Sequence, residues 1–190
     1  MILSILICGI TERELIRKTL IENIAYQILM LNASDKVEVN LIVDNKGCKP
    51  TGTKRNELID NAKGKWVIFV DDDDDVPHYF IEELLKATES DADCFATNGI
   101  ITTNGANQKQ WFISINNPYC ASWVDGKEVY LRYPNHLTCM KREIAKQVKF
   151  PDVFVGEDYA FATELHNRGL LKTEYVIEKP MYNYKFLTNK

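Results

Sequence analysis

The sequence predicts an α/β protein with a mainly parallel central sheet flanked by helices. Short apolar segments alternate in the first half with segments whose apolar residues recur at helical spacing. That alternation is typical of strand–helix–strand units, in which neighbouring strands run parallel. Five consecutive aspartates, at 71–75, follow one of the predicted strands, where open α/β sheets bind their ligands. We expect a single domain over residues 1–190, because this length suits one hydrophobic core and no linker interrupts the chain.

The elements of the first half follow from local patterns. Residues 2–8 are almost continuously apolar, as in a strand covered on both faces, and a helix is expected from Thr11. A strand at 37–44 is followed by a helix at 53–64 and a strand at 65–70. A further helix is expected from Pro77, and a further strand at 93–97.

The second half is less regular. Asn104 and Gly105 are typical of a tight hairpin turn. Residues 156–169 form a clear helix with Glu157 and Asp158 in its first turn. A short strand is expected at 135–140, a short helix at 141–148 and a final strand at 170–177.

Composition narrows the class of protein. The chain is 45% hydrophobic and 26% charged, with a net charge of −4, so nothing draws it as a whole to nucleic acid or to an anionic membrane. The five cysteines are odd in number and form no C-x-x-C pair, which indicates reduced thiols rather than disulfides or structural zinc. The N-terminus lacks the basic start of a signal peptide, and no apolar run is long enough to span a bilayer. We therefore expect a cytoplasmic protein without a transmembrane segment.

The aspartate run requires a counter-charge. A divalent cation supplies one directly, and carboxylate oxygens suit Mg²⁺ or Mn²⁺. A metal held by one or two protein carboxylates keeps positions for water or substrate phosphates. The alternative is a solvated acidic loop in which Asp75 caps the next helix. The buried strand directly before the run favours the metal site, and several registers of D-x-D remain open.

Four segments together resemble family 2 glycosyltransferases, which have the GT-A fold. Residues 53–77 carry the most specific part, in which a basic-Asn helix, an Ala-x-Gly step, an apolar strand and the acidic run follow one another. The other segments occur in the family's order and spacing, at 2–13, 37–45 and 156–165.

The resemblance implies a nucleotide-sugar donor, most often a uridine diphosphate sugar, and a Mn²⁺ or Mg²⁺ ion. Asp44 corresponds to the residue that binds the base, and Arg55 lies near the base or diphosphate. The remaining donor-binding positions are Ile10, Thr11 and Arg13 after the first strand, with Asp71, Asp72 and Asp73 as the D-x-D segment. In that segment Asp71 lies near the ribose and Asp73 binds the metal.

The resemblance also implies an inverting transfer. Asp158 corresponds to the catalytic base, with Glu157 beside it. A carboxylate at a helix start stays ionised and can accept a proton from an acceptor hydroxyl at neutral pH. His136 is a further candidate for contact with the metal or the diphosphate.

The acceptor is expected to bind the less regular half, about 99–190, while the donor binds about 1–98. Trp111 and Trp123 are candidates for stacking on an acceptor sugar. A glycan acceptor is favoured, and a protein or a modified nucleic-acid base stays open. The oligomeric state cannot be read from the sequence.

Two alternatives come from other classes of protein. A metal-dependent phosphoryl-transfer enzyme or nuclease also clusters carboxylates, but it requires a second cluster for a second metal. A non-catalytic protein could bind a nucleotide sugar without turning it over.

Overall fold

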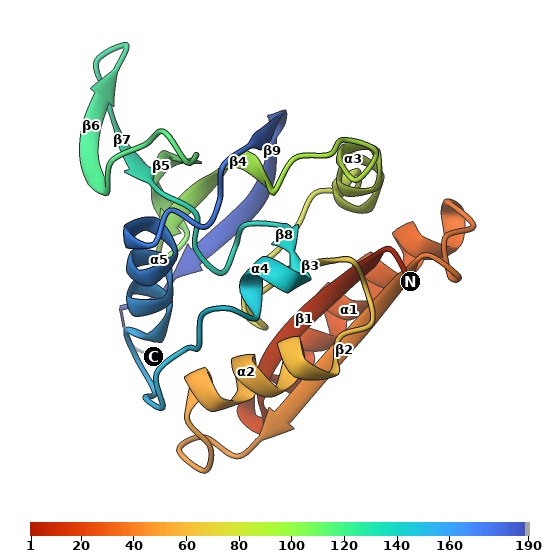
Figure 1. The fold of residues 1–190 in the computed structure, drawn as a ribbon. Coiled ribbons are helices and arrows are strands. Elements are labelled where there is room, and N and C mark those ends of the chain that lie inside the picture. The colour runs from red at the N-terminus through yellow and green to blue at the C-terminus, as the bar shows by residue number, and fades with distance from the viewer. Residues whose placement is uncertain (189–190) are drawn as a thin grey trace.

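The computed structural model describes residues 1–188, and its nine strands join one sheet with helices on both faces (Figure 1). The strands are β1 Leu3–Ile10, β2 Val37–Asp44, β3 Trp66–Phe69, β4 Cys94–Thr103, β5 Ala106–Ile113, β6 Cys120–Val124, β7 Lys127–Arg132, β8 Met140–Lys141 and β9 Glu174–Phe186. The helices are α1 Glu14–Met30, α2 Thr51–Asn61, α3 Phe80–Ala87, α4 Arg142–Ala145 and α5 Glu157–Asn167, with a 3₁₀ turn at Thr11–Arg13.

The sheet is mixed, so the expectation of a mainly parallel sheet is wrong. Its order is β2-β1-β3-β8-β4-β5-β7-β6, with β9 also paired to β4. Among residues 1–188, four strand pairings are parallel and four are antiparallel. The second half produces the difference, because β4 and β5 form a hairpin and β6 and β7 form another. The α/β class itself is confirmed.

The hairpin turn expected at Asn104 and Gly105 joins β4 to β5. Both residues have positive φ, 49° and 76°, which a tight hairpin turn requires. The strand expected at 93–97 therefore continues to Thr103, and the final strand continues to Phe186. The β6–β7 hairpin projects from the body of the molecule (Figure 1).

Two hydrophobic cores lie on opposite faces of the sheet. Alternate residues of β1 point to opposite faces, so Ile5 joins one core and Leu6 the other. The first core is covered by α1 and α3, and the second by α2, α4 and α5. Figure 1 shows α1 and α2 on opposite sides of β1 and β2. Within residues 1–188, no helix combines the length and the apolar character needed to cross a bilayer.

The parallel strands β1, β2 and β3 end at one edge of the sheet. Ile10 is paired with Asp44 in register, and the aspartate run is separated from the end of β3 by one residue. The helix expected from Thr11 begins instead at Glu14, after the 3₁₀ turn. The Thr11 hydroxyl donates a hydrogen bond to the Asp44 carbonyl at 3.2 Å, and this bond ties the ends of β1 and β2 together.

Candidate active site

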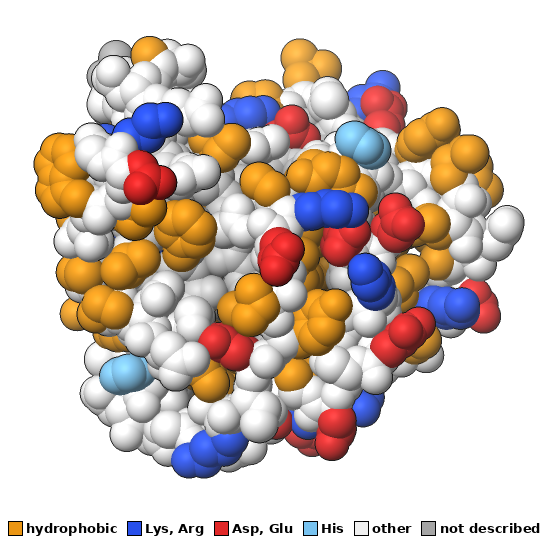
Figure 2. Space-filling view, turned by 90° about the horizontal axis from the view of Figure 1, so that it is seen from above, with side chains coloured by type: hydrophobic (Ala, Val, Ile, Leu, Met, Phe, Trp, Pro, Cys, Tyr) orange, Lys and Arg blue, Asp and Glu red, His pale blue; other side chains and the backbone are white. Residues whose placement is uncertain are grey.

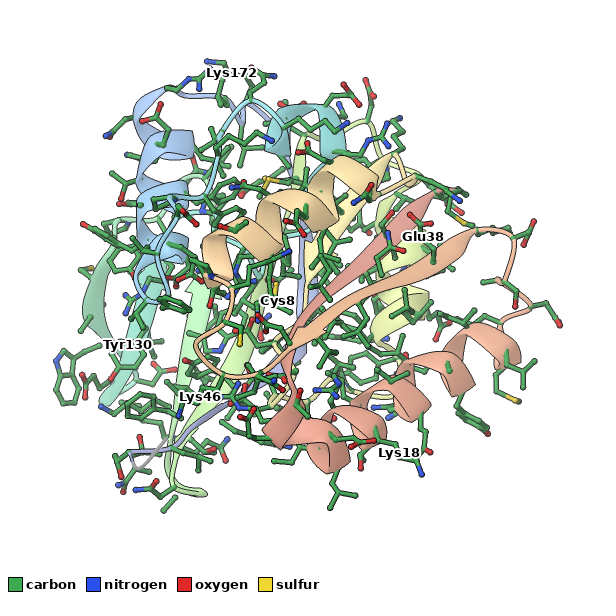
Figure 3. All side chains as sticks on the ribbon, turned by 90° about the horizontal axis from the view of Figure 1, so that it is seen from below. Cys8, Lys18, Glu38, Lys46, Tyr130 and Lys172 are labelled. Atoms are coloured by element: carbon green, nitrogen blue, oxygen red, sulfur yellow. The ribbon has the colours of Figure 1, made fainter. Side chains whose placement is uncertain are left out.

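Two adjoining cavities open at this edge of the sheet. The arginine–aspartate cavity, of about 240 Å³, is lined by residues that include Arg13, Lys54, Asp71, Asp72 and Asp73. The aromatic cavity, of about 370 Å³, is lined by residues that include Trp111, Tyr119, Tyr130, Arg132, His136 and Asp158. Figure 3 labels one lining residue of each, Cys8 near the centre and Tyr130 at the left. The two cavities form one cleft, because four residues line both: Arg55, Asp71, Phe154 and Tyr184.

Asp72 joins the aspartate run to the end of β1. Its carboxylate is buried and accepts hydrogen bonds from the Ile10 backbone N–H at 3.0 Å and from Arg13 Nη1 at 2.8 Å. Arg17 Nη1 lies 3.5 Å from the same carboxylate and donates to the Ile10 carbonyl. Arg13 Nη1 also lies 3.2 Å from Asp73. The arginines after β1 therefore supply part of the counter-charge that the acidic run requires.

Arg55 joins the run to helix α5. Its Nη2 donates to Asp71 Oδ1 at 2.9 Å and its Nε donates to Glu157 Oε1 at 3.1 Å. The buried guanidinium also packs over the rings of Phe69 and Phe150. Burial alone would lower the pKa of Arg55, but the neighbouring carboxylates, Asp71 first, raise it above its usual range.

His136 lies between Asp71 and Asp158, two carboxylates that are far apart in the sequence. Its Nε2 is 3.3 Å from Asp71 Oδ2, and its Nδ1 is 3.8 Å from Asp158 Oδ2. Burial alone would raise the pKa of Asp71, but the charge of Arg55 and then His136 lower it below its usual range. Asp71 is therefore ionised at neutral pH. The metal-ligand role of His136 stays a prediction, since both ring nitrogens face carboxylates.

Strand β9 fixes the second half of the acidic run. The Tyr182 hydroxyl accepts a hydrogen bond from the Asp71 backbone N–H and donates one to Asp74 Oδ2, both at 2.9 Å. The Lys185 backbone N–H donates to Asp74 Oδ1 at 2.7 Å. Burial, followed by the charge of Asp71, raises the pKa of Asp74 to about 7. Asp75 does not cap helix α3, because the helix begins at Phe80 and its N-terminal boundary residue is Tyr79. The backbone of Asp75 pairs with Asn183, and its carboxylate accepts a hydrogen bond from the Val76 N–H.

The Tyr182→Phe substitution is expected to lower the free energy of unfolding by about 1 to 3 kcal/mol, because it leaves two buried groups without their shared partner. It is also expected to weaken donor binding, since the Asp71 backbone loses its anchor. Chemical denaturation and donor titration measure the two effects. Tyr79→Phe is the matched control, since the Tyr79 hydroxyl donates to the Pro180 carbonyl on the surface. Equal donor affinity in the two variants would contradict a positioning role for Tyr182.

Glu157 and Asp158 have different environments although they are neighbours in sequence. Glu157 is buried and bound to Arg55, whereas the Asp158 side chain is 39% exposed and lines the aromatic cavity. The preceding Gly156 has a φ of 85°, a left-handed conformation that favours glycine and starts helix α5. The segment before it is held by α2, since the Thr51 hydroxyl donates to the Phe154 carbonyl.

Arg17 and Lys54 are two buried cations of the site that sequence reasoning missed. Lys54 Nζ donates to Asp44 Oδ1 at 2.6 Å and to the Gly9 carbonyl at 3.1 Å. A lysine or arginine rarely lies inside a protein, so the helical pattern does not mark either residue as part of a site. The only sequence signal for these two cations is the carboxylates at the strand ends, Asp44 and Asp72, because each needs a positively charged partner.

Tyr184 of β9 and Cys8 of β1 also line the cleft. Tyr184 lines both cavities, and burial raises its pKa to about 12, so its hydroxyl stays protonated at neutral pH. Cys8 lines the arginine–aspartate cavity, and burial raises its pKa to about 12, so it stays a thiol.

The two tryptophans expected at the acceptor are in different places. Trp111 is only 6% exposed, lines the aromatic cavity and packs beside Tyr182. Trp123 is 72% exposed on β6 and does not line that cavity. Stacking on an acceptor stays a prediction for both, and the structure favours Trp111 as a wall rather than a stacking platform.

Two carboxylates of the arginine–aspartate cavity suit the implied metal. Asp71 and Asp73 supply carboxylate oxygens to the same cavity, which fits a Mg²⁺ or Mn²⁺ ion bound largely by substrate phosphates. Residues 1–188 contain no group of three or more His, Cys, Asp or Glu side chains arranged to hold a metal by themselves. Within the same residues there is therefore no pair of carboxylate clusters of the kind that a two-metal nuclease uses.

Three basic residues of the second half are paired with acidic residues. Lys109 pairs with Glu128, Lys141 with Asp93, and Arg142 with Glu143. On the face drawn in Figure 2, basic and acidic side chains are interspersed. This distribution gives little support to a protein that follows a phosphate backbone.

Comparison with known structures identifies the fold. S. aureus TarS 1-349 in complex with UDP-GlcNAc superposes with a TM-score of 0.62 at 14% sequence identity, covering 100% of this chain and 60% of that one. The complex of the same fragment with UDP gives 0.60 at 14% identity, covering 97% and 60%. The longer TarS structure gives 0.60 at 15% identity, covering 97% and 37%. The chain thus spans about 60% of the TarS 1-349 fragment, and the expected GT-A fold, with its mixed sheet, is confirmed.

The sequence comparisons point to one family. No curated protein matches the chain significantly. The pattern of glycosyl transferase family 2 matches residues 33–150, which is 118 of the 190 residues. The matched part includes Arg55, the whole aspartate run and His136. The chain belongs to glycosyl transferase family 2.

Proposed function

We propose that the protein transfers a sugar from a nucleotide diphosphate sugar to an acceptor hydroxyl, with inversion and with the help of Mn²⁺ or Mg²⁺. One observation carries the proposal. Of the four buried side-chain polar atoms without a hydrogen-bond partner in residues 1–188, three belong to the cleft and its edge: Asp44 Oδ2, Arg55 Nη1 and His136 Nδ1. Buried polar groups are rarely left unpaired, so unpaired atoms gathered at one edge indicate a site that a ligand completes.

The arginine–aspartate cavity suits the donor. Asp44 is bound to the lining residue Lys54 and would offer its Oδ2 to the base, and Arg55 Nη1 is a buried donor for the diphosphate. Arg13 and Lys54 add positive charge. Asp73, with Asp71, would hold the metal. When bound, the metal would stabilise the negative charge that develops on the leaving diphosphate. Fold similarity to TarS, solved with UDP and with UDP-GlcNAc, supports a uridine donor.

The aromatic cavity suits the acceptor and the base. Asp158 takes the proton of the acceptor hydroxyl as the oxygen bonds to the anomeric carbon. The bond from that carbon to the diphosphate breaks, and its electron pair leaves with the diphosphate. One displacement of this kind inverts the anomeric centre. Glu157 acts through Arg55 as a positioning residue, because its carboxylate is already bound.

The acceptor proposed is a glycan, and we place the protein in the cytoplasm as a single domain. The donor half is about 1–98 and the acceptor half about 99–190, with Arg55 and Asp71 lining the cleft where they meet.

A thermal-shift screen tests the donor and the metal. Uridine diphosphate and uridine diphosphate sugars with Mn²⁺ are expected to raise the melting temperature more than other nucleotides, because a ligand that binds only the folded state stabilises it. The shift is expected to disappear with a chelator. If a uridine compound still raises the melting temperature in the presence of the chelator, the proposed donor stands and the proposed metal requirement is contradicted.

Two variants make the screen specific. Asp73→Asn is expected to lose the metal-dependent part of the shift. Asp75→Asn is the matched control from the same run, since Asp75 lies outside the residues that line the cleft. Equal shifts in the two variants would remove Asp73 from the metal site.

A further inference from the structure

Arg132, at the end of β7, lines the aromatic cavity in a fixed position. Its guanidinium lies over the ring of Tyr119 at 4.2 Å and over the ring of Tyr130 at 5.0 Å. Its Nη1 donates to the Cys120 carbonyl at 2.9 Å and to the Leu131 carbonyl at 2.8 Å. Two rings and two carbonyls therefore hold a side chain that would otherwise be flexible.

Arg132 differs from the other basic residues of this cavity. Arg55 is neutralised by Asp71 and Glu157, and His136 faces Asp71 and Asp158. Within residues 1–188, no carboxylate forms an ion pair with Arg132. The aromatic cavity thus has one fixed cation whose charge the described residues leave uncompensated.

We infer that the acceptor carries a phosphate or carboxylate group that binds Arg132, an inference that rests on the proposed function. A guanidinium has five N–H donors in a planar fork that matches such anions, and only part of this fork is used by the protein. The acceptor is therefore an anionic glycan, in which the charged group orients the sugar and a neighbouring hydroxyl reaches Asp158.

The rest of the cavity agrees with this class of acceptor. Tyr119 and Tyr130 provide ring surfaces for the apolar faces of sugars, and Trp111 closes the cavity as a wall. Glu157 and Asp71 are bound to Arg55, so they repel an anion less than free carboxylates would. Asp158 remains as the charged group that the anion must avoid, and this favours docking at Arg132.

Matched acceptor pairs test the inference. One pair is a uronic-acid oligosaccharide and its carboxyl-reduced form, and the other is a polyol-phosphate oligomer and the dephosphorylated polyol. Transfer is measured with a uridine diphosphate sugar and Mn²⁺. In at least one pair, kcat/KM for the anionic acceptor is expected to exceed that for the neutral acceptor about tenfold or more. A charge-assisted hydrogen-bond pair stabilises a complex by enough to give a factor of this size. The pair that shows the preference distinguishes carboxylate from phosphate.

Arg132→Gln is expected to lower kcat/KM for the anionic acceptor about 10- to 100-fold, mainly through KM, and to change the neutral acceptor little. Lys127→Gln is the matched control, because it removes one positive charge from the same strand, β7, at an exposed residue outside the cleft. Added salt is expected to reduce the preference of the native protein but not that of Arg132→Gln.

Acceptor-independent hydrolysis of the donor separates the two levels of the proposal. If the donor is hydrolysed while neutral acceptors do as well as anionic ones, or while no anionic acceptor is used, the inference is overturned and the proposed function stands. The same conclusion follows if Arg132→Gln lowers both members of a pair equally. If the donor is neither bound nor hydrolysed, the proposed function itself fails.

Discussion

The Asp158→Asn variant is expected to lose about 10²- to 10⁴-fold in kcat while it binds the donor as the native protein does. The amide keeps the size of the side chain but cannot take the proton of the acceptor. The Asp158 side chain is partly exposed and lines the aromatic cavity, so the substitution leaves no buried charge unpaired. Steady-state transfer and donor thermal shifts measure the two quantities.

Glu164→Gln is the control for this experiment. Glu164 lies on the same helix, is exposed and pairs with Arg168, so its loss is expected to leave kcat near the native value. An unchanged kcat in Asp158→Asn would show that Asp158 is not the base. A native protein that binds the donor and never turns it over would favour the non-catalytic binding protein.

The Arg55→Met variant is expected to lower the free energy of unfolding by about 3 to 5 kcal/mol, the largest effect on stability that we expect from the site. Removal of the guanidinium leaves Asp71 and the buried Glu157 without their shared partner, and two aromatic rings lose their cation. For a protein of this size the melting temperature falls by roughly 10 °C. Transfer activity is expected to fall as well, because the same side chain ties Asp71 to helix α5.

Lys49→Met removes a comparable pair from the surface. Lys49 and Glu57 are each about 40% exposed at 2.9 Å, and such pairs contribute about 0 to 1 kcal/mol. Equal stability losses in Lys49→Met and Arg55→Met would mean that Arg55 is not the structural link between the two halves. Thermal and chemical denaturation of both variants decide the point.

The regular first half could be predicted from the sequence because its signals are local. Buried strands show as apolar runs, and the strand ends that carry Ile10, Asp44 and Asp71 meet at one edge in any parallel arrangement. The expected strand at 37–44 was placed at its observed bounds, and the Asn104–Gly105 turn was located. The arrangement of the second half could not be predicted, since strand direction there depends on pairings that only the folded chain defines.

The partners of the acidic run were also beyond the sequence. Arg17 and Asp72 are far apart in the chain, and helical periodicity does not show which basic residue of α1 turns inward. From the sequence alone, the five aspartates form one acidic run whose charge a metal would balance. The structure divides them, with Asp72 bound to arginines and a backbone N–H, and Asp74 bound to β9. Asp71 is bound to Arg55 and His136, and Asp73 lies beside Arg13. A metal-ligand role for Asp71 and Asp73 stays a prediction.

The contacts of β9 with the acidic loop have a consequence for how the protein is made. Tyr182 reaches Asp74 across 108 positions of the chain, and the Lys185 backbone reaches it across 111. Contacts so remote in sequence are closed late, because chain entropy is lost before they form. A nascent polypeptide still short of residue 182 on the ribosome can pair β1, β2 and β3, yet it cannot anchor Asp74 or the backbone of Asp71. We therefore expect nucleotide affinity to emerge only after synthesis has passed this last strand.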